Sequence, residues 1–494
     1  MTALLGIDVG TTGVRCLAID ERGRLVASAS DDYPLLSPRP GWSEQRPEDW
    51  WAATCRVIVE VSTAAGSDIK GIGLAGQMHG AVFLDGSDAV IRPAILWNDQ
   101  RTQAQCDYMT QRVGARRLAE ITGNPALTGF QAPKILWLRD EEPQAYRHVV
   151  SVLLPKDYIR LRLTGERATD ASDASGTLLL DLKRREWSDE ILLALDIPKE
   201  WLPRVFEGPD QTGMIQRDVA KQLGLPDGLA VAAGGGDNAA AAVGNGIIRD
   251  GLASCSIGTS GVLFAHSDAA ATDPSGRLHA FCHAVPKRYH LMGVTLAAGG
   301  SLRWWRDLLG KGGYDDLTTL AAQTPPGAEG LLFLPYLTGE RSPHLDPLAR
   351  GAFLGLTARH GLGHLTRAVM EGVAFSLRDS LEIMAALGAA PTEIRATGGG
   401  ARSAFWRQIL ADVLGRPIAR TTADEGPAYG AALLAGVAAG VFESVEEACA
   451  GITVRPEVEE PDAERARLYD EYYAMYRDAY PATVATMHNL GKKN

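Results

Sequence analysis

The chain opens with the stretch Gly6-Ile-Asp-Val-Gly-Thr-Thr-Gly-Val14 and repeats its pattern near the middle as Ser254-Cys-Ser-Ile-Gly-Thr-Ser-Gly-Val262. Each copy predicts a β-strand, a Gly-Thr-(Thr/Ser)-Gly turn and a second strand. Gly10 and Gly258 lie 248 residues apart, about half of the 494-residue chain. A unit repeated at half length favours two domains of similar topology with a boundary near residues 244–251, and two unrelated hairpins are the alternative.

The segments around the first copy alternate between strand-like and helix-like patterns. Short apolar runs with tight turns predict an antiparallel meander, and longer amphipathic stretches predict helices. The predicted strands are residues 4–9, 14–19, 25–28, 69–74 and 81–84, and the predicted helices are residues 47–64 and 103–121. Alternating strands and helices imply an α/β architecture.

The charge balance argues against two classes of partner. The chain carries 49 basic and 60 acidic side chains, for a net charge of −11, and 46% of its residues are hydrophobic. We therefore expect neither nucleic acid nor an anionic membrane surface to be its main partner. An anionic ligand must be held locally, by backbone N–H groups or a metal ion.

The cysteines and the apolar segments favour a cytoplasmic protein. The six cysteines are widely spaced and form neither a Cys-x-x-Cys pair nor a zinc-type spacing with histidine, which predicts reduced thiols. The first residues enter a predicted strand directly, without a signal-peptide pattern. The uncharged stretch at residues 426–442 is rich in Gly and Ala and contains Pro427, so a packed internal helix is favoured over a membrane span.

The two Gly-Thr turns are candidates for phosphate binding. Glycine lets the backbone approach closely, and N–H groups with Thr hydroxyls can converge on anionic oxygens, although an ordinary hairpin is the alternative for either turn alone. Asp8 ends the strand before the first turn, where its carboxylate could hold Mg²⁺ against the phosphates through water. The P-loop signature is absent, so a different phosphate-binding design is expected.

A second candidate acid follows the predicted strand at residues 229–233. Three glycines come after this strand, and then Asp237 and Asn238. Asp237 is placed to accept a hydroxyl proton from an acceptor substrate, and Asn238 to bind a neighbouring hydroxyl. The alternative is an Asx cap that opens the Ala-rich helix predicted next, and both interpretations can hold together.

Two polar segments of the first half resemble the linings of sugar sites. The loop Gly76-Gln-Met-His-Gly80 lies between predicted strands, and His79 could hydrogen-bond a sugar hydroxyl or serve a structural role. The run Trp97-Asn-Asp-Gln-Arg101 combines an aromatic face with hydrogen-bonding groups. Its alternative is a packed turn with a solvated Arg.

Three segments of the second half also carry polar or glycine-rich patterns. A predicted strand at residues 394–397 runs into Gly398-Gly-Gly-Ala401 and a predicted helix at residues 403–414, a turn that suits a nucleotide but recurs in proteins that bind nothing there. Residues 339–343, and His360 with His364, lack a further set of metal ligands. We assign them to surface or hinge roles.

Taken together, these segments resemble the FGGY family of carbohydrate kinases over nearly the whole chain. The resemblance is carried by GIDVGTTGVR (6–15), GQMHG (76–80), PAILWNDQR (93–101), APKILW (132–137), LPKDYIRLRLTGE (154–166), GGGDNAA (234–240), SIGTSGV (256–262), GGGARS (398–403) and a long second signature at residues 351–371. It implies an α/β fold of two actin-like, ribonuclease-H-like domains, residues 1–245 and 246–494, that close on a central cleft. It also implies ATP-dependent phosphorylation of a small sugar, with Mg²⁺ as cofactor.

The resemblance assigns roles position by position. Asp237 would be the catalytic base, and Asp8 would lie near the metal and the phosphates. The remaining assignments are Met78, His79, Asp237 and Asn238 for the sugar, Thr11, Thr12 and Arg15 for one phosphate turn, Thr259 for the other, and Gly299, Gly400 and Ala401 for the nucleotide site. Ala404 departs from the pattern, because some relatives place an Asn near the adenine there, so contacts to the base are less defined than contacts to phosphate.

The acceptor loop at residues 76–80 favours one sugar substrate over others. Within the family, Met78 and His79 favour members that phosphorylate D-xylulose over glycerol kinase relatives, which carry an Arg-Glu pair at these positions. Ribulose, fuculose, gluconate and glycerol are alternative acceptors, and a homodimer is a possible assembly.

Two other classes of protein are alternatives to a kinase. A non-transferring actin-like ATP switch leaves His79, Asp237 and Asn238 without a purpose, and an inactive sugar-binding regulator is disfavoured because both candidate acids are present.

Overall fold

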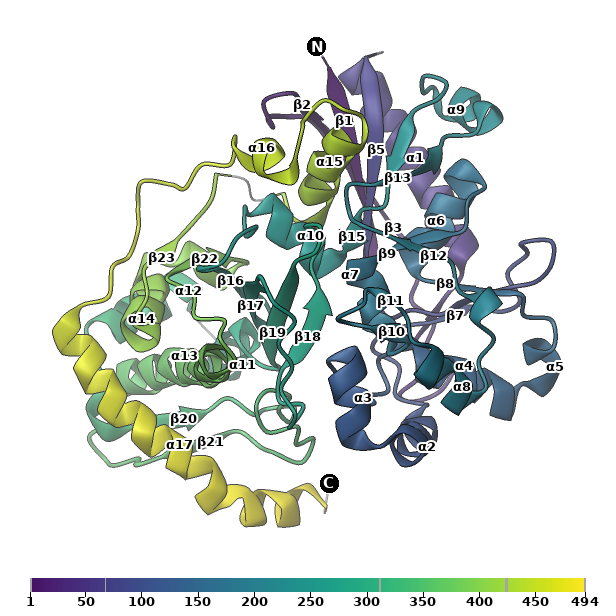
Figure 1. Cartoon of the computed structure of the whole chain (residues 1–494). Coiled ribbons are helices and arrows are strands. Elements are labelled where there is room, and N and C mark those ends of the chain that lie inside the picture. Colours follow the sequence, from purple (N-terminus) through teal and green to yellow (C-terminus); the bar gives the residue numbers. More distant parts are fainter. Residues whose placement is uncertain (1, 67, 311, 423–424, 493–494) are drawn as a thin grey trace.

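Two mixed β-sheets, each flanked by helices, form the two halves of the molecule (Figure 1). The structure is a computed structural model that describes residues 2–66, 68–310, 312–422 and 425–492. The first sheet comes from the part of the chain coloured purple to teal in Figure 1, and the second from the teal and green part.

The first sheet contains the first Gly-Thr hairpin. Its strands are β1 (Ala3–Val9), β2 (Gly13–Asp20), β3 (Leu25–Asp32), β5 (Ile69–Gly76), β13 (Gln211–Met214), β14 (Ala230–Ala232) and β15 (Gly235–Gly236). Their order is β13-β14-β5-β1-β2-β3, and β15 also pairs with β5. β1, β2 and β3 form the predicted antiparallel meander, whereas β5 runs parallel to β1. β14 and β15 run parallel to β5.

The second sheet repeats this arrangement. Its strands are β16 (Leu252–Ile257), β17 (Gly261–Ser267), β18 (His279–Cys282), β19 (Tyr289–Thr295), β22 (Glu393–Thr397) and β23 (Ile418–Ala419). Their order is β18-β19-β17-β16-β22-β23. β16 and β17 are antiparallel, and β22 runs parallel to β16 just as β5 runs parallel to β1. The repeated topology that the two Gly-Thr stretches predicted is therefore confirmed.

Helices cover both faces of the first sheet. Leu5 and Ile7 of β1 pack in one core with residues of α1 (Pro47–Ala65), whereas Leu4 packs on the opposite face with α15 (Pro427–Ala438). α15 comes from far along the chain and lies directly on the strand backbones. A Cβ atom on Gly6 would lie 1.9 Å from the carbonyl oxygen of Ala428, so only glycine permits this approach.

The two halves are joined by a pair of helices. α10 (Asp237–Gly244) follows β15, and it packs against α15. A Cβ atom on Gly430 of α15 would lie 1.8 Å from the carbonyl oxygen of Ala240 of α10. The backbones of the two helices are therefore in close contact at the junction of the halves.

The remaining elements extend each half. In the first half these are β4 (Glu44–Gln45), β6 (Val82–Leu84), β7 (Ala94–Ile95), β8 (Ser151–Leu153), β9 (Ala168–Asp170), β10 (Leu180–Asp181), β11 (Glu186–Trp187), β12 (Arg204–Phe206), α2 (Gln103–Val113), α3 (Ala115–Thr122), α4 (Gln131–Glu141), α5 (Pro143–Tyr146), α6 (Pro155–Thr164), α7 (Ala171–Ala174), α8 (Asp189–Leu195) and α9 (Arg217–Leu223). In the second half they are β20 (Leu332–Leu334), β21 (Ala352–Leu354), α11 (Gly299–Leu309), α12 (Tyr314–Ala322), α13 (Leu362–Ala386), α14 (Ala404–Leu414), α16 (Val445–Cys449) and α17 (Ala463–Gly491). Short 3₁₀ turns occur at Ser175–Thr177, Lys199–Trp201, Ala328–Gly330 and Gly400–Arg402.

One predicted helix is wrong in its extent. The stretch at residues 103–121 forms two helices, α2 and α3, because Gly114 between them has a φ of 88° and turns the chain out of the α-helical path. All six cysteines are free, as predicted. Within the described ranges, no helix combines the length and the apolar character needed to cross a bilayer.

We expect the contact between α10 and α15 to tolerate no side chain at Gly430. Gly430→Ala should destabilise the fold by about 1–3 kcal/mol, because the added Cβ meets backbone atoms of α10 that cannot move aside. Denaturant unfolding checks this, with Gly86→Ala as the control, because nothing lies within 4 Å of a Cβ atom at Gly86. Equal unfolding midpoints for the two variants would contradict the close packing.

Candidate active site

Parallel strands bring the two candidate acids to one edge of the first sheet. Ala75 of β5 has Asp8 of β1 as its partner on one side and Gly235 of β15 on the other. Adjacent strands lie about 4.8 Å apart, so the backbones at Asp8 and Gly235 are about 10 Å apart across β5. Asp237 follows two residues later as the first residue of α10. The structure therefore places both acids at the same edge of the sheet.

Burial gives both carboxyl groups raised pKa values. Burial raises the pKa of Asp237 to about 6, against the opposing effect of hydrogen bonds from Asn238. Burial raises the pKa of Asp8 to about 7; the negative charge of Asp237 adds to this rise and Arg15 opposes it. Each acid thus feels a low-dielectric environment, and Asp8 also feels the charge of its neighbour.

Asp237 is held by the residue that follows it. Asn238 donates two hydrogen bonds to Oδ1 of Asp237, one from its backbone N–H at 2.7 Å and one from its side-chain amide at 2.9 Å. The cap position of α10 belongs to Gly236, and Asp237 makes no capping hydrogen bond. The Asx-cap alternative is therefore wrong, and the second carboxylate oxygen of Asp237 has no hydrogen bond to any described residue.

The predicted acceptor loop lies next to the base. It connects β5 with β6, and a Cβ atom on Gly236 would lie 2.9 Å from Cγ of Met78. His79 has a φ of 69°, and its Nδ1 lies 2.6 Å from the carbonyl oxygen of Gly176. Because a carbonyl oxygen only accepts, Nδ1 carries the proton and Nε2 is left as an acceptor. Burial lowers the pKa of His79 to about 3, so the ring is neutral.

A buried lysine supports this loop, and residue patterns alone did not reveal its role. Nζ of Lys134, in α4, donates to the carbonyl oxygens of His79 at 2.7 Å and Gly129 at 2.5 Å. The rings of Phe130 and Phe281 lie 4.4 and 6.1 Å from the ring of His79. Phe281 belongs to β18, so the second half contributes to the wall of the acceptor loop.

The first Gly-Thr turn is tight and tied to its surroundings. The N–H of Gly10 donates to the carbonyl oxygen of Gly13 at 3.0 Å. Oγ1 of Thr11 donates to Gln77 at 3.2 Å and accepts from Nε1 of Trp97 at 2.9 Å, while Thr12 is exposed. The turn is therefore anchored through Thr11 and open to ligand at Thr12.

Arg15, by contrast, is engaged across the two halves. Its guanidinium forms an ion pair with Glu425, and Nη1 also donates to the backbone carbonyl of Glu425 at 3.2 Å. In this arrangement Arg15 is not free for the phosphate that the sequence assigned to it.

The second Gly-Thr turn borders a cavity in the second half of the molecule. The cavity has a volume of about 530 Å³. Its lining consists of Ile257, Gly258, Thr259, Gly299, Gly300, Leu302, Arg303, Tyr314, Asp315, Thr318, Gly399, Gly400, Arg402, Ser403 and Trp406. Three of the assigned nucleotide residues, Thr259, Gly299 and Gly400, therefore lie together. Ala401 is buried behind this lining.

The cavity wall also contains residues that the sequence did not single out. Arg303 lies on α11, Tyr314 and Thr318 lie on α12, and Trp406 lies on α14. These residues are separated in sequence from the glycine motifs by a helical turn or by a loop, so no local sequence pattern links them to the nucleotide cavity. They provide aromatic and polar surface suited to a nucleoside.

Asp8 is the residue that fits a cation best. Its Oδ1 is buried and has no hydrogen-bond partner in the part of the chain that the structure describes. Those residues contain no group of three or more His, Cys, Asp or Glu side chains that could hold a metal ion. A bound cation would therefore have to share Asp8 with oxygens of its ligand and of water.

Two further motifs behave differently from expectation. Glu340 is buried and accepts from Oγ1 of Thr295 at 2.6 Å and from the N–H of Leu296 at 3.0 Å, so a surface role for residues 339–343 is wrong. Arg101 is not solvated, because it is buried in ion pairs with Asp99 and Glu44. Among the described residues, His360 and His364 accept backbone hydrogen bonds at the start of α13 and hold no metal arrangement.

The two sheets share one topology, each contains a Gly-Thr hairpin, and the first carries an acid at the edge where its strands end. These features define a two-domain α/β sugar kinase with actin-like, ribonuclease-H-like domains. The chain belongs to the FGGY family of carbohydrate kinases: the model of the family's N-terminal domain matches residues 3–244, and that of its C-terminal domain matches residues 253–439.

Several relatives match along the whole chain. The xylulose kinase of Escherichia coli strain K12 is 44% identical over 485 residues, which cover 98% of this chain and 99% of the relative. The xylulose kinase of Lactococcus lactis is 42% identical over 500 residues, covering 100% and 99%. A crystal structure of a xylulose kinase from Brucella ovis superposes with a TM-score of 0.93 at 40% identity and covers 98% of this chain and 100% of that one.

The acceptor loop gives a prediction that needs no substrate. The His79 ring should stay neutral with its proton on Nδ1 throughout the neutral pH range, because burial lowers its pKa to about 3. Nitrogen NMR of the imidazole ring checks this, and comparison with His79→Gln identifies the resonance. A titration midpoint near the ordinary histidine value of about 6.5 would contradict the buried hydrogen bond to Gly176.

Proposed function

We propose that this kinase transfers the terminal phosphoryl group of ATP to a hydroxyl of D-xylulose, forming D-xylulose 5-phosphate and ADP. The observation that carries the proposal is the position of Asp237, a half-buried carboxylate with one unengaged oxygen beside the Met78-His79 loop. Relatives named xylulose kinase that match the full chain at above 40% identity support the choice of acceptor.

ATP would occupy the 530 Å³ cavity of the second half. The adenosine would lie against Tyr314 and Trp406, and the phosphates would extend along the turn at Thr259 toward the first turn at Thr11 and Thr12. Backbone N–H groups at glycine-rich turns can bind phosphate without net positive charge, which suits a chain with a net charge of −11. Arg15 would have to leave Glu425 to take part.

Asp8 would hold Mg²⁺, because its buried Oδ1 lacks a partner among the described residues. When bound with ATP, Mg²⁺ neutralises charge on the phosphate oxygens. Asp8 would otherwise repel the phosphates, so its carboxylate is useful only beside a cation.

D-xylulose would bind between the acceptor loop and the start of α10. Nε2 of His79 would accept a hydrogen bond from one hydroxyl, and Met78 would pack against the carbon chain. The unengaged oxygen of Asp237 would accept the proton of the reacting hydroxyl as the new O–P bond forms and the bond to ADP breaks. With a pKa of about 6, Asp237 is ionised at neutral pH and still basic enough to take this proton.

The proposal includes a division of the chain into residues 1–245 and 246–494, directly after Asn245, the residue that caps the end of α10. Closure of the two halves over the substrates would exclude water and limit wasteful hydrolysis of ATP. The α10–α15 pair would form the pivot, since α10 belongs to the first half, α15 to the second, and the two helices are in contact. A cytoplasmic location, where ATP is supplied, goes with this proposal.

The direct test is ADP formation from MgATP in the presence of different acceptors. We expect the highest kcat/KM with D-xylulose and lower values with ribulose, fuculose, gluconate and glycerol. A preference for one of these would correct the acceptor. ADP release at the same rate without any sugar would instead support an ATP switch.

Removing the proposed base should abolish most turnover. Asp237→Asn should lower kcat by about 10²–10⁴-fold while ATP still binds, because a general base contributes that much and the nucleotide cavity is elsewhere. Asp218→Asn is the matched control, since Asp218 also lies in the first turn of a helix, α9, but is exposed. Near-normal turnover in Asp237→Asn would rule out this assignment.

The pH profile should report the same group. Since Asp237 must be ionised to accept a proton, kcat/KM for the acceptor should fall about tenfold per unit as the pH drops below about 6, and level off above it. Initial rates at saturating MgATP check this. The acidic limb should be missing from the residual activity of Asp237→Asn; its persistence there would assign the limb to another group.

A further inference from the structure

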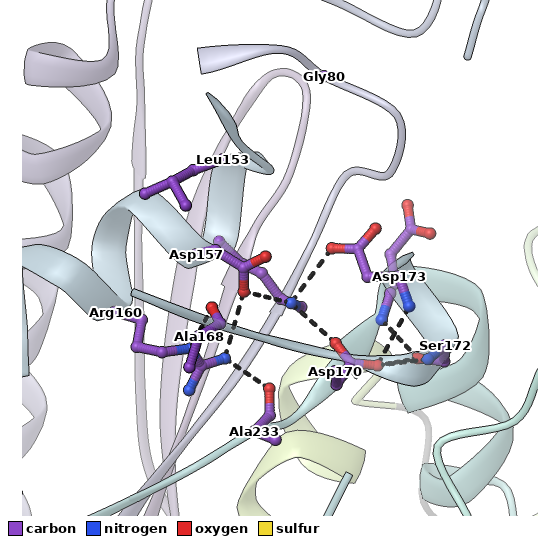
Figure 2. A network of polar contacts seen from close by, with 12 residues as sticks. Gly80, Leu153, Asp157, Arg160, Ala168, Asp170, Ser172, Asp173 and Ala233 are labelled. Atoms are coloured by element: carbon purple, nitrogen blue, oxygen red, sulfur yellow. Dashed lines mark hydrogen bonds and ion pairs between the residues drawn. The ribbon is translucent and has the colours of Figure 1, made fainter. Parts of the chain in front are cut away.

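A cluster of charged side chains is fully buried in the first half of the molecule, and Figure 2 shows its contacts. Nζ of Lys156 contacts Asp157 at 2.6 Å, Asp170 at 2.8 Å and Asp173 at 3.3 Å. Arg160 contacts Asp157 at 3.4 Å. All five side chains are 0% exposed, and none takes part in the proposed reaction.

The charges of this cluster do not balance. Two cations face three carboxyl groups, and a net negative charge enclosed away from water is strongly unfavourable. Arg160 is fixed by further hydrogen bonds to the carbonyl oxygens of Ala232 and Ala233, both at 2.6 Å. One carboxyl group is therefore expected to carry a proton.

Asp173 is the member least supported as an anion. Asp170 accepts from the backbone N–H groups of Ser172 and Asp173 and from the Ser172 hydroxyl. Among the described residues, neither carboxylate oxygen of Asp173 has a hydrogen-bond partner, and its contact with Lys156 is the longest of the three. Burial, together with Asp170 and Asp157, raises the pKa of Asp173 well above its ordinary value, although Lys156 opposes the rise.

Nearby titratable groups on elements packed against α7 do not change this balance of opposite charges. β18 carries His279 and Cys282, and β12 carries Arg204, which is exposed and therefore adds no buried charge. Burial lowers the pKa of His279 and raises that of Cys282, so both are neutral.

The cluster is connected to the base by hydrogen bonds. The Ser172 hydroxyl donates to Asp170 and accepts from the N–H of Gly236 at 3.1 Å. Gly236 directly precedes Asp237. The path from Lys156 to the base thus runs through Asp170, Ser172 and one backbone N–H.

The same cluster adjoins the acceptor loop. A Cβ atom on Gly76 would lie 3.1 Å from Cβ of Lys156, and one on Gly80 would lie 2.6 Å from Pro155. The start of α6 therefore supports both ends of the loop that carries Met78 and His79. One buried group of side chains contacts the two parts of the site that must be held in register.

We propose that Lys156 and Asp170 are positioning residues that hold Asp237 against the acceptor loop through Ser172, and that Asp173 carries the proton that makes the cluster neutral. The positioning role rests on the proposed function of Asp237 as base. The placement of the proton does not.

The positioning role is tested by deleting one hydroxyl. Ser172→Ala should lower kcat by about 10–100-fold and leave KM for ATP unchanged, because a shift of about 1 Å at a reacting group can cost about 100-fold. It should also shift the acidic limb of the pH profile. Ser175→Ala is the matched control: Ser175 is buried in the same segment and bonds to Ser172 O and Cys282 N, but not to Gly236.

Each result decides the question. A kcat loss in Ser172→Ala well beyond that of Ser175→Ala supports positioning. Equal losses in both variants, or an unchanged kcat and pH profile in Ser172→Ala, would overturn it, because a merely structural hydroxyl would affect unfolding and not the reaction.

The proton is tested by comparing two isosteric variants. Asp173→Asn should keep the wild-type kcat, because Asn resembles a protonated Asp, and its unfolding midpoint should not fall below that of the wild type. Asp170→Asn should lower both, since it removes a charge that Lys156 needs. Equal damage in the two variants would overturn the placement of the proton. If Asp170→Asn fails to fold while Asp173→Asn folds normally, the placement is supported and Ser172→Ala still decides the positioning role.

The pH dependence of unfolding tests the proton on Asp173 independently of catalysis. Asp173 has a higher pKa in the folded protein than in the unfolded chain. Its contribution to the free energy of unfolding is therefore fully present at a pH below the pKa of the unfolded chain, and it is lost as the pH rises through the pKa of the folded protein. The wild-type midpoint should therefore fall relative to that of Asp173→Asn as the pH rises, and parallel curves would contradict the proposal. The unfolding measurements use no substrate, so they test the proton on Asp173 even if the wild type forms no ADP with any sugar. That second outcome would reject only the proposed function.

Discussion

The candidate active site depends on one constraint, which is that β5 runs parallel to β1 on one side and to β15 on the other. The carboxyl ends of the three strands consequently meet at one edge of the sheet. Ala75 has Asp8 and Gly235 as its two neighbours there. An antiparallel strand in either place would send one acid to the opposite edge. The acceptor loop, the buried charge cluster and α10 all begin at or adjoin this edge, so their arrangement follows from it.

Much of the fold could be predicted from local patterns. The meander, the two Gly-Thr hairpins and the strand before Gly398 follow from apolar runs bounded by turn residues, and the structure confirms them. The break at Gly114 was missed because amphipathic spacing continues through it. The contact of α15 with the first sheet was also beyond prediction, because no local pattern indicates which distant helix will lie on Gly6 and Gly73.

Site residues could be predicted where a reactive side chain lies at a strand end or in a loop that the sequence marks. Those whose role depends on tertiary contacts could not. Asp8, His79 and Asp237 lie at strand ends or loops that the sequence marks. Lys134, Lys156 and Arg160 lie in helices, where charged residues normally face water, and only the structure shows that they are enclosed. Glu425 lies 410 positions beyond Arg15, a separation across which no pattern predicts an ion pair.

The position of α15 bears on how the protein is made. The strands of the first sheet are complete once Gly236 has been synthesised, but the helix that covers their second face ends at Ala438, about 200 residues later. At roughly 5–20 residues per second, a ribosome needs about 10–40 s to produce that length. During this interval the nascent first half displays Leu4, Leu17 and Ile19 without their cover. Translation speed and chaperone access therefore bear directly on the yield of folded enzyme.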